Sequence, residues 1–174
     1  SLSSAPYQEV LSFCIKVIPE GVGSQYINSL NDGEEVEFRG PVGHFVPSQE
    51  HNNHYFIATG VGISPMIGMI NDLLHKNTEQ KVHLLFGLRF EDDLIYSELF
   101  ETLDNAHENF SYQYTLTRPT ETWRGLTGRV TEHLLTKHED EIFYLCGSRE
   151  MVISVRKQLI ELEIDAKKIK FEIF

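Results

Sequence analysis

Two short glycine turns each follow an apolar run and precede a stretch with helical spacing. The first turn reads T-G-V-G-I-S-P over residues 59–65, and the second reads C-G-S over residues 146–148. Glycines between a strand and a helix let the backbone approach a phosphate closely, and the free N–H groups at the helix start bind the anion. Each turn is therefore a candidate nucleotide contact, although a plain tight turn explains a single Gly-x-Gly about equally well.

The first turn differs from the usual dinucleotide signature. Gly60 and Gly62 form G-x-G-x-x-P instead of G-x-G-x-x-G, and Pro65 suits a first helical turn because its missing N–H costs nothing there. We expect a side chain at Gly62 to weaken nucleotide binding with only a modest loss of stability. In the second turn, Cys146 at a strand end is more often a core residue than a reactive one, but Gly147 directly after it favours a functional role.

Three further motifs are weaker. Gly87-Leu88-Arg89 follows another apolar run and places a cation at the same rim. The G-V-G-S of residues 21–24 precedes a short helix and is a second candidate anion site. The G-P-V-G-H-F of residues 40–45 fits either a flat pocket or a structural corner. His51 and His54 have no third ligand nearby in the sequence, so we expect them at the surface and not in a metal site.

Composition limits the partners. The chain has 174 residues, 41% of them hydrophobic and 24% charged, which is typical of one soluble globular domain or slightly more. The net charge of −11 argues against nucleic acid or an anionic membrane as the main partner. No apolar run approaches a membrane span, and the first six residues show no signal peptide. Cys14 and Cys146 lack metal or redox spacing, which favours a reduced, cytoplasmic setting.

The elements that must position these residues alternate between strands and helices. We expect strands at 9–18, 34–39, 54–58, 82–86, 110–116, 142–146 and 169–173. We expect a glycine-rich turn with a short helix over 21–30, and helices at 65–75, 94–103, 127–136 and 149–162. The pattern predicts a small β-rich unit over residues 1–48, a polar linker over 47–53, and an α/β unit over 54–174 with a doubly wound parallel sheet of five strands. In such a sheet both glycine turns face one crevice.

Taken in order, six motifs resemble the ferredoxin-NADP reductase superfamily over the whole chain. They are G-x-x-S (21–24), G-P-x-G-x-F (40–45), T-G-x-G-x-x-P (59–65), G-x-R (87–89), C-G (146–147) and E-x-F (172–174). The opening Ser1-Leu2-Ser3-Ser4 also resembles the tail of the family's R-x-Y-S-x-x-S flavin signature, whose Arg and Tyr are not in this chain. The resemblance implies a partial antiparallel flavin barrel over 1–48 and an NAD(P)-binding domain over 54–174. Ser148 replaces the Pro often found after C-G.

The resemblance also implies roles for individual residues. For FAD these are Ser1, Ser4, Gly21, Gly23, Ser24, Gly40 and Gly43. For NAD(P)H they are Thr59, Gly60, Gly62, Pro65, Gly87 and Gly147, with Arg89 and Arg118 on the adenosine side. Cys146 is placed near the nicotinamide, and Glu172 and Phe174 near the flavin ring. The cofactors carry the hydride chemistry, so the chain needs no acid–base pair and no metal.

These motifs indicate a flavoprotein reductase that passes electrons from NAD(P)H through FAD to an acceptor outside this chain, such as a ferredoxin or oxygenase component. A nucleotide-binding regulatory module without flavin is the alternative, and an α/β interaction domain with incidental glycines is a third. Arg118, Arg124 and Arg129 could accept the 2′-phosphate of NADPH, whereas the acidic run 91–93 would oppose it, so the sequence favours NADH slightly.

Overall fold

The computed structural model describes residues 1–40, 42–48, 53–76, 79–134 and 140–173. The strands are β1 (Asn53–Thr59), β2 (Val82–Leu88), β3 (Phe110–Leu116), β4 (Leu126–Thr127), β5 (Glu141–Gly147) and β6 (Ile169–Ile173). The α-helices are α1 (Val22–Ser29), α2 (Ile63–His75), α3 (Ser97–Ala106) and α4 (Arg149–Glu161). Short 3-10 turns are η1 (Gly60–Gly62), η2 (Glu91–Asp93), η3 (Val130–Glu132) and η4 (Ala166–Lys168).

The strands form one parallel sheet in the order β4-β3-β2-β1-β5-β6. The chain builds outward from β1 through β2, β3 and β4, and then returns to place β5 on the other side of β1. The predicted doubly wound parallel sheet is therefore confirmed, but it has six strands where the sequence indicated five. The additional strand, β4, is only two residues long, which is too short to show an alternating pattern.

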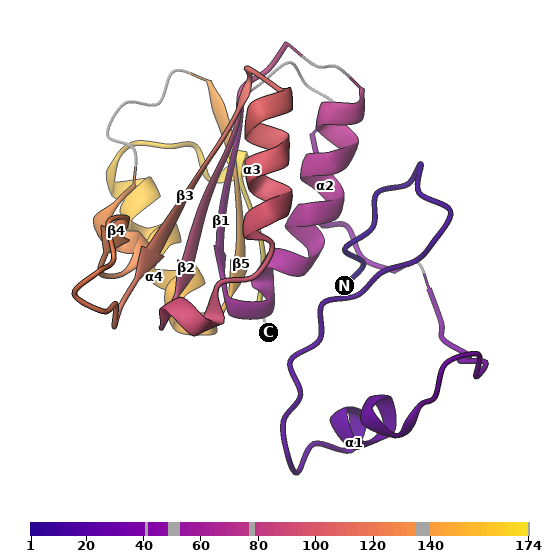
Figure 1. Cartoon of the computed structure of the whole chain (residues 1–174). Helices are drawn as coiled ribbons and strands as arrows, with labels where there is room; N and C mark the ends of the chain where they lie inside the picture. The colour runs from indigo at the N-terminus through magenta and orange to yellow at the C-terminus, as the bar shows by residue number, and fades with distance from the viewer. Residues whose placement is uncertain (41, 49–52, 77–78, 135–139, 174) are drawn as a thin grey trace.

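Alternation along the strands builds a three-layer sandwich. Phe56, Phe86 and Tyr144 face α2 and α3, whereas Ile57 and Leu145 face α4. Figure 1 shows α2 and α3 together on one side of the sheet and α4 on the other. Both faces of β1 and β5 are fully buried, as expected for central strands of a parallel sheet.

Two helix predictions need correction. The helix expected over 94–103 begins at Ser97, because Tyr96 adopts a left-handed conformation (φ 62°) at the N-terminal boundary. The helix expected over 127–136 is absent from its described part. There the chain forms β4 and the single turn η3, since Thr127 pairs with Leu116 of β3 and Gly128 adopts φ +99°. Residues 135–136 of that predicted helix lie outside the described residues.

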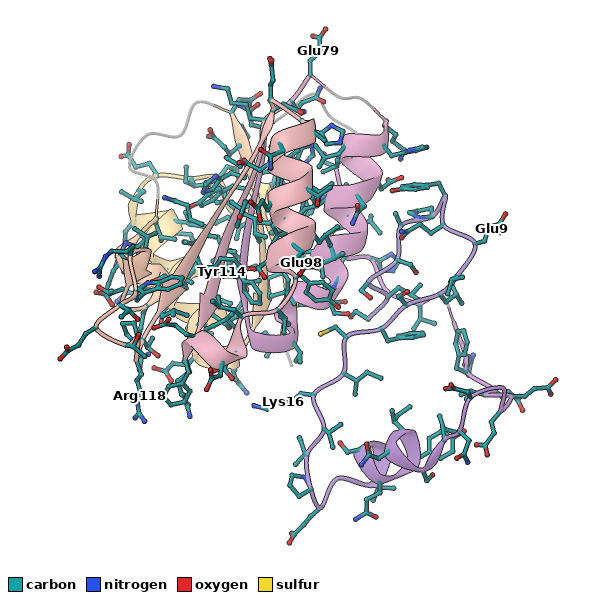
Figure 2. All side chains as sticks on the ribbon, in the orientation of Figure 1. Glu9, Lys16, Glu79, Glu98, Tyr114 and Arg118 are labelled. Atoms are coloured by element: carbon teal, nitrogen blue, oxygen red, sulfur yellow. The ribbon has the colours of Figure 1, made fainter. Side chains whose placement is uncertain are left out.

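The described part of residues 1–48 forms no barrel, and neither 9–18 nor 34–39 is a strand. One isolated antiparallel bridge joins Leu2 and Phe13. A strand needs a partner for its N–H and C=O groups, and no described segment supplies one here. In Figure 1 this segment, with α1, extends away from the sheet, and in Figure 2 its side chains, near the labelled Glu9 and Lys16, surround a single run of backbone.

The same segment exposes its apolar side chains. Among the described residues, 14 of the 21 large hydrophobic side chains classed as exposed lie between positions 7 and 46, and α1 buries no residue. Its first residues are an exception, because Ser3 and Ala5 are buried beside α2. A Cβ at Gly68 of α2 would come within 2.8 Å of the Ser4 carbonyl oxygen. The start of the chain is thus packed on the α/β unit, while the remainder of the segment has no core of its own.

Candidate functional site

The site lies where the winding of the sheet reverses. β1 and β5 are neighbours, and their helical connections leave on opposite faces of the sheet. At their carboxyl ends, Thr59 leads through η1 into α2, and Gly147 leads through Ser148 into α4. Open α/β sheets bind ligands outside the carboxyl ends of their strands at this kind of switch point. The structure therefore brings the two predicted glycine turns together.

Thr59 is enclosed by glycines from both neighbouring strands. A Cβ added to Gly87 would lie 3.1 Å from the Thr59 methyl group and 2.7 Å from Val130, and one added to Gly147 would overlap the Thr59 hydroxyl. The Ser148 N–H approaches the Thr59 hydroxyl at 3.4 Å, and the Ser148 hydroxyl accepts from Met151 N at 3.3 Å as the N-cap of α4. Gly87 and Gly147 thus make room for Thr59 at the centre of the crevice.

The structure gives Gly62 a packing role that the sequence did not indicate. A Cβ here would overlap the carbonyl group of Cys146 and come within 2.6 Å of Gly147 N. These are backbone atoms of β5, which cannot rotate away. The expectation that a side chain at Gly62 costs only modest stability is therefore wrong: Gly62 lets η1 pack against the end of β5.

Gly60 is the glycine that leaves space for a ligand. It is exposed, adopts φ +55°, and a Cβ there would meet no atom within 4 Å. The left-handed backbone explains why glycine stands here. Pro65 is the third residue of α2, in its first turn as predicted, and is buried. The open surface at Gly60, which precedes α2 in the turn η1, fits a pyrophosphate approaching backbone N–H groups.

Cys146 occupies the predicted strand end but is fully buried in the core beneath α2. Burial raises the pKa of its thiol to about 12, and the nearby Glu172 carboxylate adds to the effect. The thiol is thus protonated and unreactive at neutral pH. Any contribution of Cys146 to chemistry must come through the shape of the site.

A second group of residues lies beside this strand end. β5 and β6 place Cys146 opposite Glu172. The Ser1 hydroxyl donates to Glu172 at 3.4 Å, and a Cβ on Gly43 (φ +103°) would sit 3.8 Å from the same carboxylate. Predicted flavin-side residues from both ends of the 1–48 segment therefore meet the C-terminal strand. Phe174, the last residue of the E-x-F motif, lies outside the described residues.

Ser64, in the first turn of α2, ties this group to the sheet. Its hydroxyl donates to the Ser1 carbonyl at 2.8 Å and accepts from Cys14 N at 3.3 Å. The sequence places Ser64 inside the T-G-x-G-x-x-P motif but assigns it no role. A hydroxyl in an otherwise apolar, buried helix start was the available signal.

The remaining flavin-side predictions are not brought to the crevice. Gly21 is the N-cap residue of α1, and Gly23 and Ser24 lie in its first turn. The Ser24 hydroxyl accepts from Ile18 N at 2.9 Å. Gly40 is exposed, with only the Phe38 ring within 4 Å of an added Cβ. Ser4 accepts from Ser12 N at 3.1 Å through its hydroxyl.

Arg89 and Arg118 are adjacent beyond the ends of β2 and β3, where Arg118 N donates to Arg89 O at 2.9 Å. Both side chains are exposed, and the Arg118 guanidinium lies 6.0 Å from the centre of the Phe90 ring. Figure 2 shows Arg118 extending beyond this end of the sheet. Glu91 accepts from the Thr120 N–H and hydroxyl, and these bonds lower the pKa of Glu91. A fixed carboxylate therefore stands among these cations.

The other predicted cations are engaged elsewhere. Arg129 forms a 2.6 Å ion pair with Glu150, and Arg124 donates to the carbonyls of Glu121 and Trp123. The prediction that His54 is a surface residue is wrong, because the residue is only 2% exposed. His51 lies outside the described residues. Within the described ranges, no group of three metal-ligating side chains occurs and no helix is long and apolar enough to cross a membrane.

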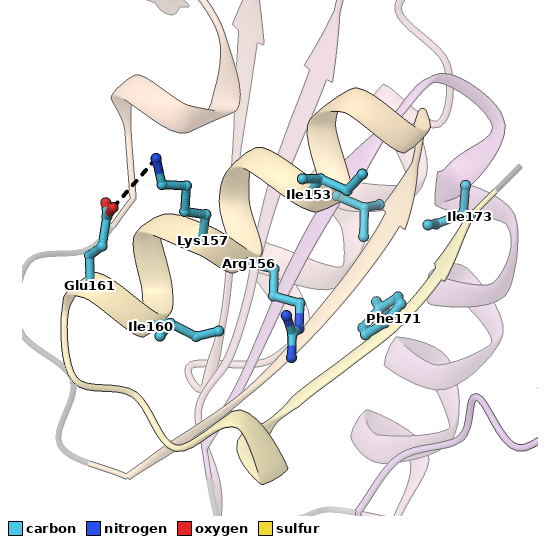
Figure 3. A pocket seen from close by; sticks show the side chains of 8 residues that line it. Ile153, Arg156, Lys157, Ile160, Glu161, Phe171 and Ile173 are labelled. Carbon is cyan, nitrogen blue, oxygen red and sulfur yellow. Dashed lines mark ion pairs between the residues drawn. The ribbon is translucent and has the colours of Figure 1, made fainter.

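One hollow lies away from this crevice, on the outer side of α4 and β6 (Figure 3). Ile153, Ile160, Phe171 and Ile173 line it with the Arg156 side chain, and its volume is about 550 Å³. It contains none of the predicted site residues. The switch-point crevice therefore remains the candidate site.

Comparison with known families agrees with this geometry. Residues 56–157 match the oxidoreductase NAD-binding domain, and residues 1–46 match the oxidoreductase FAD-binding domain. The chain therefore belongs to the oxidoreductase NAD-binding domain family, and its first 46 residues match an oxidoreductase FAD-binding domain.

Two curated relatives match most of this chain. The chain is 31% identical over 158 residues to the anthranilate 1,2-dioxygenase electron transfer component of Acinetobacter baylyi, a match covering 88% of this chain and 46% of that protein. It is 32% identical over 167 residues to one of the subunits of the Na(+)-translocating NADH-quinone reductase of Serratia proteamaculans, covering 90% and 41%. The chain thus spans less than half the length of these relatives.

Solved structures show the same fold. The Amycolatopsis cytochrome P450 reductase GcoB matches with a TM-score of 0.85 and 23% identity over 100% of this chain and 55% of that one. A Neisseria gonorrhoeae ferredoxin NADP+ reductase with bound FAD and NADP matches with a TM-score of 0.81 and 20% identity, over 99% and 78%.

Proposed function

We propose that the protein carrying this chain oxidises a nicotinamide nucleotide at the β1/β5 switch point and passes the electrons through FAD to a separate acceptor. The observation that carries this proposal is the meeting of two groups of residues at one strand end. The nucleotide side contributes Thr59 and Gly60, the flavin side contributes Ser1 and Gly43, and Cys146 and Glu172 lie between them.

The role of the chain is to bind and orient. When bound, the nicotinamide supplies a hydride and the flavin accepts it. The open backbone at Gly60 and the helix starts beside it would hold the pyrophosphate. The protonated, buried Cys146 would form part of the floor beneath the reacting rings and exclude water. Alignment of two rings at about 3–3.5 Å is most of what such a site must provide.

Residues 1–48 would supply only part of the flavin site, and residues 54–174 the nucleotide domain. α1 begins at Val22, its N-cap residue Gly21 provides no side-chain cap, and a Cβ on Gly23 would meet no atom within 4 Å, so its first turn has room for a phosphate. Segments 9–18 and 34–39 support this division, because they form no strand in the described residues, where Phe13 makes only a single bridge to Leu2. We infer that stable FAD binding requires partner strands for these segments.

NADH is the favoured nucleotide. A 2′-phosphate near Arg118 would lie among the acidic residues that follow Phe90, and the Glu91 carboxylate is held there by Thr120. Arg129 is already paired with Glu150. NADPH binding would therefore meet an unfavourable carboxylate and only part of a cationic pocket.

The acceptor would be an iron–sulfur or oxygenase-type component. This proposal rests on the curated relatives, one of which is the electron transfer component of a dioxygenase. The chain's net charge of −11 would favour a basic docking face on such a partner.

The test is anaerobic stopped-flow reduction of the FAD-loaded, full-length protein by NADH and by NADPH. We expect each nucleotide, at saturating concentration, to bleach the flavin absorbance, and we expect NADH to have the lower dissociation constant. A protein that binds nucleotide at the crevice but shows no flavin reduction would instead be the regulatory module of this fold.

A further inference from the structure

Two residues on neighbouring strands hold the chain that links the flavin side to the nucleotide side. Tyr144 of β5 and Lys170 of β6 are paired in register and point to the same face of the sheet. The Lys170 ammonium lies 5.7 Å from the centre of the Tyr144 ring. We call these two residues the junction pair.

The junction pair binds the segment just after the G-P-V-G-H-F motif. Ser48 N donates to the Tyr144 hydroxyl at 2.8 Å, and the Lys170 ammonium donates to the Val46 carbonyl at 3.2 Å. The Phe45 ring packs edge-on against Tyr144, with 6.2 Å between ring centres. Three positions of the connecting segment are therefore fixed to the sheet by two side chains.

A buried histidine supports Tyr144 from below. His54 Nδ1 lies 3.2 Å from the Tyr144 hydroxyl, and the two rings stack 5.7 Å apart. Burial lowers the pKa of His54 to about 4, with Lys170 adding to the effect, so the ring is neutral at working pH. A neutral Nδ1 can accept a hydrogen bond from the Tyr144 hydroxyl, while the hydroxyl oxygen accepts a hydrogen bond from Ser48 N. These two bonds orient the Tyr144 O–H group.

The next residues on this face of the same two strands belong to the proposed site. Two positions beyond the junction pair, on the same face, Cys146 stands opposite Glu172. Glu172 is the carboxylate beside Gly43 and Ser1. The distance from the junction pair to Cys146 and Glu172 is therefore fixed by the hydrogen-bonded pairing of β5 and β6.

We propose that Tyr144 and Lys170 are positioning residues that fix the height of the flavin-side segment 43–48 above the carboxyl ends of β5 and β6. The role proposed for these two side chains is to hold this segment and not to bind nucleotide or flavin. Their effect is on the separation of the two rings, to which hydride transfer is steeply sensitive, since a misplacement of about 1 Å can cost about 100-fold in rate. The inference rests on the proposed reductase function.

Tyr144→Phe is the direct test because it removes one oxygen atom and keeps the ring. Tyr114→Phe is the matched control: the Tyr114 hydroxyl donates to the Ile95 carbonyl at 2.7 Å, on β3 and away from the junction. The first readout uses this chain alone and measures amide hydrogen exchange at Ser48 by NMR. We expect Tyr144→Phe to speed exchange of the Ser48 amide by about tenfold or more, and Tyr114→Phe to leave it unchanged.

The second readout uses the FAD-loaded, full-length protein. We expect Tyr144→Phe to lower the limiting rate of flavin reduction about tenfold with a nucleotide dissociation constant within about twofold of wild type. Lys170→Met should act in the same direction. Two results would overturn the positioning role. One is an equal rate of Ser48 amide exchange in the Tyr144→Phe and Tyr114→Phe variants, and the other is an equal loss of flavin-reduction rate in the two variants. A wild-type protein with no flavin reduction at all would overturn the proposed function and this inference with it.

Discussion

Gly62→Ala should destabilise the nucleotide domain strongly, whatever its effect on nucleotide binding. The added methyl would overlap the Cys146 carbonyl and lie 2.6 Å from Gly147 N. Both belong to β5, a central strand paired with β1 and β6, so relief requires moving η1 or the sheet. Overpacking a core costs about 1–3 kcal/mol, and a backbone obstacle places this variant at about 3 kcal/mol or more.

Gly60→Ala is the control within the same turn. Its methyl would meet no atom within 4 Å, but the residue adopts φ +55°. A left-handed conformation costs an alanine about 1–2 kcal/mol. Since a domain of this size is stable by about 5–15 kcal/mol, both variants should fold, with Gly62→Ala clearly the weaker.

Urea unfolding followed by circular dichroism gives the two free energies of unfolding, and NADH titration by fluorescence gives the two affinities. We expect Gly62→Ala to lose more stability and Gly60→Ala to lose more affinity relative to stability. A Gly62→Ala protein as stable as wild type but unable to bind NADH would refute the packing role.

Three further predictions use the same chain. Burial lowers the pKa values of His54 and His83 to about 4, below the usual value of about 6.5, so the unfolded chain binds more protons than the folded chain between these two pH values. The free energy of unfolding should therefore fall by up to about 1.4 kcal/mol per pH unit for each group as pH drops from 6.5 towards 4. Urea titrations should show a flatter pH dependence for His54→Gln. A thiol reagent at pH 8 should modify Cys14, which is partly exposed, and spare Cys146 until the protein is unfolded; rapid modification of two thiols in the native protein would contradict the burial of Cys146. The purified chain should be colourless after gel filtration with FAD, because segments 9–18 and 34–39 have no partner strands among the described residues; a yellow protein with stoichiometric FAD would show that residues 1–48 suffice for flavin binding.

The α/β part of the fold was predictable because its strands are strongly patterned. The buried runs at β1, β2 and β5 and the helical spacing of α2 and α4 indicated the element types, and the glycine turns located the crevice. The sequence did not indicate β4, because two residues are too few to show the alternation of apolar and polar side chains that marks a strand. The helix expected at 127–136 failed because Gly128 and the Thr127–Leu116 pairing override local propensity.

The functional details were less predictable because they depend on which atoms meet across the fold. The sequence could not show that Gly62 contacts the β5 backbone while Gly60 faces open space, since both are glycines in one motif. It also gave no sign that His54 lies beneath Tyr144. The barrel expected over 1–48 failed for a physical reason: strand sequences form strands only when partners are present.

A nicotinamide nucleotide binding where β1 and β5 end is the central claim. The most direct measurement is an NMR titration of this chain with NADH, following backbone amide shifts. We predict the largest changes at Thr59–Gly62 and at Gly147–Arg149, with little change over residues 153–161 of α4. Shifts confined to the hollow lined by Ile153, Ile160 and Phe171 (Figure 3), or no shifts at millimolar NADH, would contradict it.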